Sequence, residues 1–241
     1  MPLLLLSNST APGRSYLEHA REAIAALLGD RRRVTFVPYA LADHDGYAAQ
    51  VATALAPLGV EVESVHAGDP GARIAAAEAI FVGGGNTFRL VARLHELDLV
   101  EPIRAAVGAG VPYLGSSAGT NVAAPTLRTT NDMPIVQPRS FQTLGLVPFQ
   151  INPHYLDPDP TSTHQGETRQ ERLVQFLEEN DVPVLGMREG TWLTVDGSRC
   201  RLGGLAAGAR LFRRGMPPTE IQAPADLDEL LCLPAVFDRP L

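Results

Sequence analysis

Cysteine is scarce in this chain of 241 residues, which contains only Cys200 and Cys232. Two cysteines are too few for the disulfide framework of a small secreted protein, and such sparse use is typical of a reducing compartment. The sequence therefore predicts a cytoplasmic protein whose stability comes from a hydrophobic core. A chain of this length can bury such a core as one domain.

Long apolar runs are also lacking. The opening run Leu3-Leu4-Leu5-Leu6 is ended by polar residues 7–10, and no basic segment precedes it, as a signal peptide would require. A membrane-spanning helix needs about 20 apolar residues. We therefore expect no membrane segment, and we interpret residues 3–6 as a buried first strand.

Concentrated positive charge and metal-ligand patterns are absent as well. The 20 basic residues are outnumbered by 27 acidic ones, and the arginine clusters 31–33 and 213–214 stand alone. A nucleic-acid partner is therefore disfavoured, and an acidic ligand would need a locally positive pocket. The sequence has neither a P-loop nor a dinucleotide-binding glycine motif, and no His/Cys/Asp cluster has the spacing of a metal site. We expect no metal and no cofactor.

Short apolar runs alternate with helical patterns through the first 115 residues. The patterns predict strands at 3–6, 34–37, 60–65, 79–82 and 111–114, and helices at 16–28, 47–58, 72–77, 87–97 and 99–107. Fully apolar strands that alternate with helices indicate an α/β fold, with a mostly parallel sheet covered by helices on both faces.

The second half of the chain has weaker patterns. Strands are expected at 149–151, 182–185 and 191–195, with a helix at 167–178 and a hairpin turn at 196–197. The proline-rich tail from Met216 is expected to wrap the surface. Because no internal repeat or low-complexity linker is present, residues 1–241 are expected to form a single domain.

The most informative motif is Gly115-Ser116-Ser117-Ala118-Gly119, which follows the strand predicted at 111–114. The spacing G-x-S-x-G is that of a strand–nucleophile–helix elbow, in which a strained turn exposes a serine and leaves no room for neighbouring Cβ atoms. The pattern is common by itself. Read as an elbow, it makes Ser117 the nucleophile of a hydrolase.

A serine nucleophile needs a base, and His154 is the natural candidate because it follows the strand predicted at 149–151. Ligands of parallel α/β sheets bind beyond the carboxyl ends of strands, so the loops after four predicted strands are expected to converge on one edge. The alternative for His154 is a loop histidine bonded to backbone. His19, His44, His66 and His95 are expected to be solvated. His164 is expected to be a plain loop residue, with a place in the lining of a pocket as the alternative.

Two acids could orient that base. Glu189 lies in the loop after the strand at 182–185, and Asp132 lies 15 residues after Ser117. Asp132 could instead be a turn or cap residue, and Glu189 a surface acid paired with Arg188. The sequence leaves the choice open.

A serine hydrolase also needs donors for the oxyanion. The backbone N–H of Ala118 is one candidate, and the loop Gly83-Gly84-Gly85 can supply the other, since glycine allows close approach of a backbone N–H. The alternative is a phosphate-binding loop, which the absence of a following Lys-Ser/Thr pair disfavours.

Several ordered segments resemble the peptidase E (aspartyl dipeptidase) family. They lie between Phe81 and Glu189 and comprise Phe81-Val82-Gly83-Gly84-Gly85-Asn86-Thr87, the Ser117 motif, Thr129-Thr130-Asn131-Asp132-Met133-Pro134, Ile151-Asn152-Pro153-His154 and Gly166-Glu167-Thr168-Arg169. The start Leu6-Ser7-Asn8-Ser9 is similar too. The resemblance implies a glutamine-amidotransferase-like α/β fold, a serine-dependent dipeptidase that releases N-terminal Asp from Asp-X dipeptides, and a homodimer.

The resemblance also implies roles for individual residues. Ser117 matches the nucleophile, His154 the base, Glu189 the acid of a Ser-His-Glu triad and Asp132 a position often named in the charge relay. Gly85 and Ala118 match the oxyanion hole. Arg169 matches a residue that holds the substrate aspartate, with Asn86 and Thr87 as further substrate-binding residues. One departure is Ser116, where relatives often have a bulky residue.

Two other functions are compatible with the same residues. One is a cyanophycinase-like peptidase that acts on β-aspartyl-arginine, and the other is a non-catalytic binding protein on the same scaffold. The GGGNT and NDMP segments favour the dipeptidase over the first, and retention of the whole constellation disfavours the second. A glutamine amidotransferase would require cysteine in place of Ser117.

Overall fold

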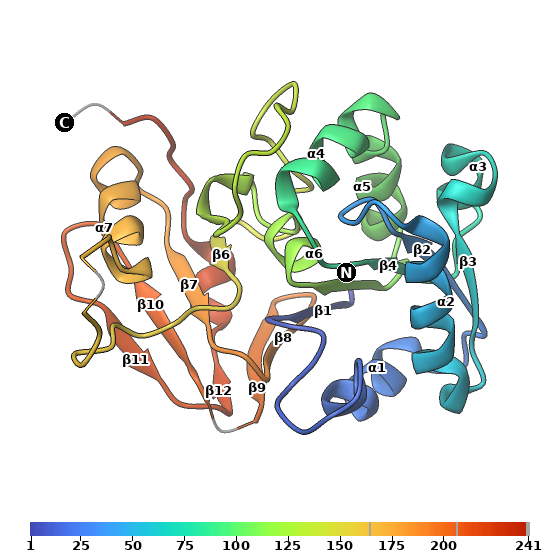
Figure 1. Ribbon diagram of the computed structural model, residues 1–241, viewed down its shortest axis with the longest axis horizontal. Coiled ribbons are helices and arrows are strands. Elements are labelled where there is room, and N and C mark those ends of the chain that lie inside the picture. Colours follow the sequence, from blue (N-terminus) through green and yellow to red (C-terminus); the bar gives the residue numbers. More distant parts are fainter. Residues whose placement is uncertain (164, 206, 240–241) are drawn as a thin grey trace.

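The computed structural model describes residues 1–163, 165–205 and 207–239, so His164 lies outside the described residues. Two β-sheets and their covering helices lie side by side in Figure 1. The larger sheet has eight strands, in the spatial order β12 (Ala225–Asp226), β9 (Arg199–Gly204), β8 (Thr191–Asp196), β1 (Leu3–Leu6), β5 (Tyr113–Ser116), β4 (Ile80–Val82), β2 (Arg33–Val37) and β3 (Glu61–Ser64).

The strands from β1 to β3 in that order are parallel, whereas β8, β9 and β12 add an antiparallel flank. Side chains on β1 alternate between two cores: Leu3 and Leu5 face one, and Leu4 and Leu6 face the other. This alternation is the period of two that a strand imposes. It confirms the predicted mostly parallel sheet with two buried faces.

Helices cover both faces of this sheet. On one face, α1 (Arg21–Leu28) and α2 (His44–Leu55) contribute Ile24, Val51 and Leu55 to the core. On the other face lie α3 (Pro70–Ala75), α4 (Thr87–Glu96) and α5 (Val100–Gly108), with their apolar sides inward. Figure 1 shows the two groups of helices on opposite sides of the strands. Within the described residues, no helix has the length and apolar character needed to cross a membrane.

The smaller sheet has four strands, in the order β11 (Thr219–Ile221), β10 (Ala209–Phe212), β7 (Val184–Met187) and β6 (Gln150–Asn152). One face packs under α7 (Arg169–Glu179) through Leu173 and Leu177, and the other joins the core of the larger sheet. The prediction that all four loops extend from one sheet edge is therefore wrong. The loops with Ser117 and with Gly83-Gly84-Gly85 follow β5 and β4 of the larger sheet. The loops with His154 and Glu189 follow β6 and β7 of the smaller sheet.

Other local predictions also need correction. The first helix begins at Arg21 because Leu17 has a φ of 59° and only a 3-10 turn (Glu18–Ala20) precedes it. The tail after Met216 adds the edge strands β11 and β12 and buries Leu230, where a surface wrap was expected. His19 is not solvated: both ring nitrogens are buried without a partner among the described residues, and burial lowers its pKa.

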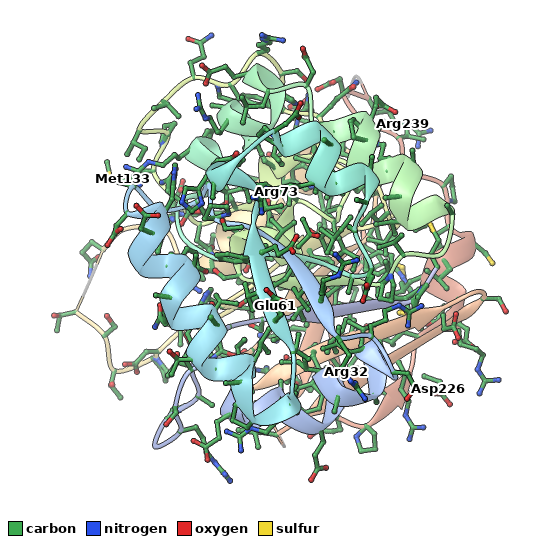
Figure 2. All side chains as sticks on the ribbon, turned by 90° about the vertical axis from the view of Figure 1, so that its right-hand side faces the viewer. Arg32, Glu61, Arg73, Met133, Asp226 and Arg239 are labelled. Carbon is green, nitrogen blue, oxygen red and sulfur yellow. The ribbon has the colours of Figure 1, made fainter. Side chains whose placement is uncertain are left out.

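The opposite edge of the larger sheet is β3, which Figure 2 views from outside. Glu61 on this strand faces the viewer, and Glu63 lies in ion-pair range of Arg73 at 4.0 Å. Charged side chains on an edge strand oppose pairing with another chain. This end of the molecule lies away from the loops that follow β6 and β7.

Candidate active site

Ser117 lies at the junction of β5 and the short helix α6 (Ala118–Asn121), with φ of 53° and ψ of −108°. A Cβ atom at Gly115 would lie 2.6 Å from the carbonyl oxygen of Gly119, and one at Gly119 would overlap the carbonyl oxygen of Val82. Gly115 is therefore required by close packing within the turn, and Gly119 by close packing of the turn against β4.

The ring of His154 lies between Ser117 and Glu189. Its Nε2 is 2.9 Å from Ser117 Oγ, and its Nδ1 is 2.7 Å from Glu189 Oε1. The side chain of His154 is 36% exposed and that of Glu189 is 51% exposed, so the pair opens to solvent. The three side chains form one continuous hydrogen-bonded chain with the arrangement of a serine–histidine–acid triad.

Strand pairing explains how His154 and Glu189 meet across 35 residues. β6 and β7 are parallel, with Asn152 opposite Gly186, so the loops that follow them leave the sheet at the same end. Arg188 does not pair with Glu189. Its guanidinium binds the carboxylates of Asp157 and Glu220, which leaves Glu189 for His154.

Asp132 occupies a different place. Its Oδ2 accepts hydrogen bonds from the backbone N–H and the hydroxyl of Thr87, both at 2.7 Å. Asn86 caps α4 by accepting from the N–H of Arg89, and its amide donates to the carbonyl of Met133. The Asp132 loop is thus fastened to the start of α4, and of the two candidate acids it is Glu189 that contacts the His154 ring.

The glycine loop after β4 packs directly on Ser117. A Cβ at Gly84 would lie 3.0 Å from Ser117 Cβ, and one at Gly85, where φ is 132°, would lie 2.6 Å from the carbonyl oxygen of Ala40. The N–H of Gly84 donates to the Tyr47 hydroxyl at 2.7 Å. The N–H groups of Gly85 and Ala118 donate to no described residue, so both remain available to a ligand.

A cavity of about 220 Å³ opens beside Ser117 and His154. Arg169, which begins α7 behind a capping box formed by Thr168 and Glu171, lines it together with Thr87, Asn131 and Asp132. Burial lowers the pKa of the Arg169 guanidinium, and its Nη1 is buried without a partner in the described part of the chain. An unpaired, partly buried cation provides a site for an anionic group.

Two residues that sequence reasoning did not assign to the site also position it. The Ser7 hydroxyl donates to the carbonyl of Met187 at 2.8 Å and accepts from the N–H of His154 at 2.9 Å. The side-chain oxygen of Asn8 accepts from the N–H of Gly190 at 2.7 Å. Their place directly after β1, a parallel strand, is the signal that could have identified them.

No group of three or more His, Cys, Asp or Glu side chains with the geometry of a metal site occurs among the residues that the structure covers. The two cysteines are unpaired.

Comparison with solved structures agrees with the fold. A putative peptidase E protein from Listeria monocytogenes EGD-e superposes with a TM-score of 0.65 at 22% identity, covering 85% of this chain and 98% of that one. A peptidase from an acI-B1 Actinobacterium gives a TM-score of 0.67 at 16% identity, with coverages of 94% and 96%. Both likenesses support a mixed α/β fold with a large, mostly parallel sheet.

Sequence comparison identifies the family. "Peptidase E" of Streptomyces coelicolor is 63% identical over 239 residues, or 99% of this chain and 98% of the relative. A "Probable alpha-aspartyl dipeptidase" of Drosophila melanogaster is 51% identical over 233 residues, covering 95% and 97%. The sequence model of peptidase family S51 matches residues 3–203. The chain therefore belongs to peptidase family S51.

Proposed function

We propose that this chain is a serine dipeptidase that hydrolyses Asp-X dipeptides through an acyl-enzyme on Ser117. The observation that carries the proposal is the hydrogen-bonded chain from Ser117 Oγ through His154 to Glu189. The relatives named peptidase E and alpha-aspartyl dipeptidase support the same activity. The turn at Ser117 would act as a nucleophile elbow that presents the hydroxyl to the cavity.

In the first half-reaction, Ser117 Oγ attacks the aspartyl carbonyl carbon while its proton passes to His154 Nε2. Glu189 holds the imidazole tautomer and stabilises the imidazolium. The N–H groups of Gly85 and Ala118 would hydrogen-bond the oxyanion. The C–N bond then breaks, the proton on His154 passes to the leaving amine, and the aspartyl ester of Ser117 remains. Water, deprotonated by His154, hydrolyses the ester and restores the serine.

Recognition of aspartate is assigned to Arg169. A guanidinium can bind a carboxylate with two parallel hydrogen bonds, and this guanidinium lines the cavity beside Ser117. In a protein of net charge −7, an acidic substrate needs such a local cation. We assign two further residues to shaping the substrate site. Thr87 lines the same cavity and binds Asp132, and Asn86 holds the adjoining loop through the carbonyl of Met133.

Further proposals concern organisation and location. The apolar core shared by the two sheets supports a single peptidase domain over residues 1–241. The two unpaired cysteines support the cytoplasm as its location. The resemblance to peptidase E supports a homodimer, which light scattering coupled to gel filtration would test.

Replacement of Ser117 by alanine tests the mechanism. The variant should lose more than about 10³-fold in kcat on Asp-Leu and all labelling by a fluorophosphonate probe, with an unchanged melting temperature. Retained turnover in Ser117→Ala would refute the acyl-enzyme. Faster cleavage of β-Asp-Arg than of Asp-Leu by the parent protein would favour the cyanophycinase-like function instead. Binding of both peptides without turnover or labelling would favour a binding protein.

A further inference from the structure

A second cavity, of about 310 Å³, lies beside the glycine loop. One wall is the segment after β2, with Tyr39, Leu41 and Ala42, and the other is a face of α4 that carries Arg89, Ala92 and Arg93. Residues three and four positions apart share one side of a helix, so these three side chains face the cavity together.

Arg89 is the unusual group in its lining. Its guanidinium makes no hydrogen bond or ion pair with any residue that the structure describes, although its backbone N–H is fixed by Asn86. Arg93, by contrast, is bonded to Glu96 at 2.6 Å and lies over the Tyr39 ring. Among the described residues of the lining, Glu96 is the one acid, and Arg93 pairs with it. Arg89 therefore gives the cavity an unpaired positive charge beside the apolar side chains of Leu41 and Ala92.

This cavity begins close to Ser117. A Cβ at Gly84 would lie 3.6 Å from Ser117 Oγ, and a Cβ at the next residue, Gly85, would lie 2.8 Å from Leu41 Cδ2. Consecutive Cα atoms are about 3.8 Å apart. The attacking oxygen and the Leu41 wall therefore lie against two adjacent residues of the same glycine loop.

We propose that this cavity binds the leaving residue X of an Asp-X dipeptide, with Arg89 binding its free C-terminal carboxylate. The proposal rests on the dipeptidase function given above. In a dipeptide, that carboxylate lies about one residue length, ~3.5 Å, beyond the scissile nitrogen, and a long arginine side chain can span the remainder. Leu41, Ala42, Ala92 and Val136 would receive an apolar side chain of X.

The proposal also gives a physical reason for restriction to dipeptides. In a longer peptide, residue X continues into a neutral amide at the position where Arg89 would meet a carboxylate. A charge-assisted hydrogen bond is then replaced by a weaker one. Arg169 would thus select the first residue of the substrate, and Arg89 its length.

The test compares Asp-Leu with its C-terminal amide, Asp-Leu-NH₂, in the parent protein and in Arg89→Gln. The parent should cleave the free acid with a kcat/KM about 10- to 100-fold higher than that of the amide. Arg89→Gln should lose this preference. Its kcat/KM on Asp-Leu should fall to the value for Asp-Leu-NH₂, mainly through a higher KM. Its kcat/KM on Asp-Leu-NH₂ should differ from the parental value by less than about twofold.

Arg21→Gln is the matched control, because Arg21 lies at the exposed start of α1 on the opposite face of the sheet and its loss changes the net charge equally. It should keep the parental preference. Equal cleavage of acid and amide by the parent, or a parallel loss on both in Arg89→Gln, would overturn the role of Arg89 while leaving the dipeptidase intact. Cleavage of neither peptide would overturn both.

Discussion

The backbone N–H of His154 donates a hydrogen bond of 2.9 Å to the hydroxyl of Ser7, a residue 147 positions earlier in the chain. The same hydroxyl donates to the carbonyl of Met187, two residues before Glu189. One buried side chain at the end of β1 therefore holds both the loop of the proposed base and the strand that leads to the proposed acid.

Replacing Ser7 with alanine should impair catalysis more than binding. Loss of the hydroxyl leaves a buried N–H and a buried carbonyl without this partner, which costs about 1–3 kcal/mol of unfolding free energy. We expect kcat on Asp-Leu to fall about 10-fold or more, with KM within twofold. Steady-state kinetics and urea denaturation measure both effects. Thr10→Ala, an exposed change in the same segment, is the control, and a parental kcat in Ser7→Ala would contradict the argument.

Replacing the two candidate acids should reduce activity to different extents. Glu189→Gln replaces the carboxylate that contacts His154 Nδ1 at 2.7 Å, and an amide there can hold the wrong tautomer, so kcat should fall at least about 100-fold. Asp132→Asn should act more mildly and mainly through KM, because Asp132 organises Thr87. Kinetics of both variants at matched pH would decide. A larger loss of kcat in Asp132→Asn would mean that the triad acid is wrongly assigned.

Arg169 should control selectivity for aspartate. Arg169→Met should lower kcat/KM on Asp-Leu by about 100-fold, chiefly through KM, and should reduce the preference for Asp-Leu over Asn-Leu. Arg169→Lys should recover part of the loss because it keeps the charge without the fork geometry. Unchanged selectivity in Arg169→Met would remove this residue from substrate recognition.

Tyr47 should affect catalysis by positioning the glycine loop. Its hydroxyl accepts the N–H of Gly84, the residue before the proposed oxyanion donor Gly85. Tyr47→Phe removes that acceptor, so kcat should fall about 10-fold with little change in KM. Tyr16→Phe is the comparison, since the Tyr16 hydroxyl lies 3.2 Å from that of Tyr47 and leaves the Gly84 bond in place. Similar losses in the two variants would point to a general packing effect.

Acid pH should destabilise the protein partly through His19. Burial lowers its pKa below the ordinary value, so the unfolded chain binds the proton more readily than the folded one. The stability that neutral His19 provides is complete above the unfolded pKa of about 6.5 and declines as the pH falls below it. His19→Phe should therefore lose less unfolding free energy between pH 7.5 and pH 5 than the parent, by denaturant titration. An equal loss in both would be inconsistent with a buried neutral His19.

Features set by residues close together in the sequence could be predicted from it, whereas features set by contacts between distant residues could not. The Leu3-to-Leu6 run predicted a strand buried on both faces, because apolarity at every position is a local property. The division into two sheets was not predictable, since β7 pairs with β6 and β10 while β8 pairs with β1, and local patterns do not specify a partner. The same reason left Asp132 and Glu189 undecided. Proximity in sequence favoured neither, and only the β6–β7 register brings Glu189 to His154.

The central position of β1 has a consequence for how the molecule folds. β1 is the first strand made, yet its neighbours are β5 and β8, and Ser7 binds partners 147 and 180 residues away. Closing such long loops is slow compared with forming local helices. A chain still on the ribosome would carry Ser117 and His154 before the residues of β7 and β8 exist. Peptidase activity would therefore appear only after β7 and β8 have been made.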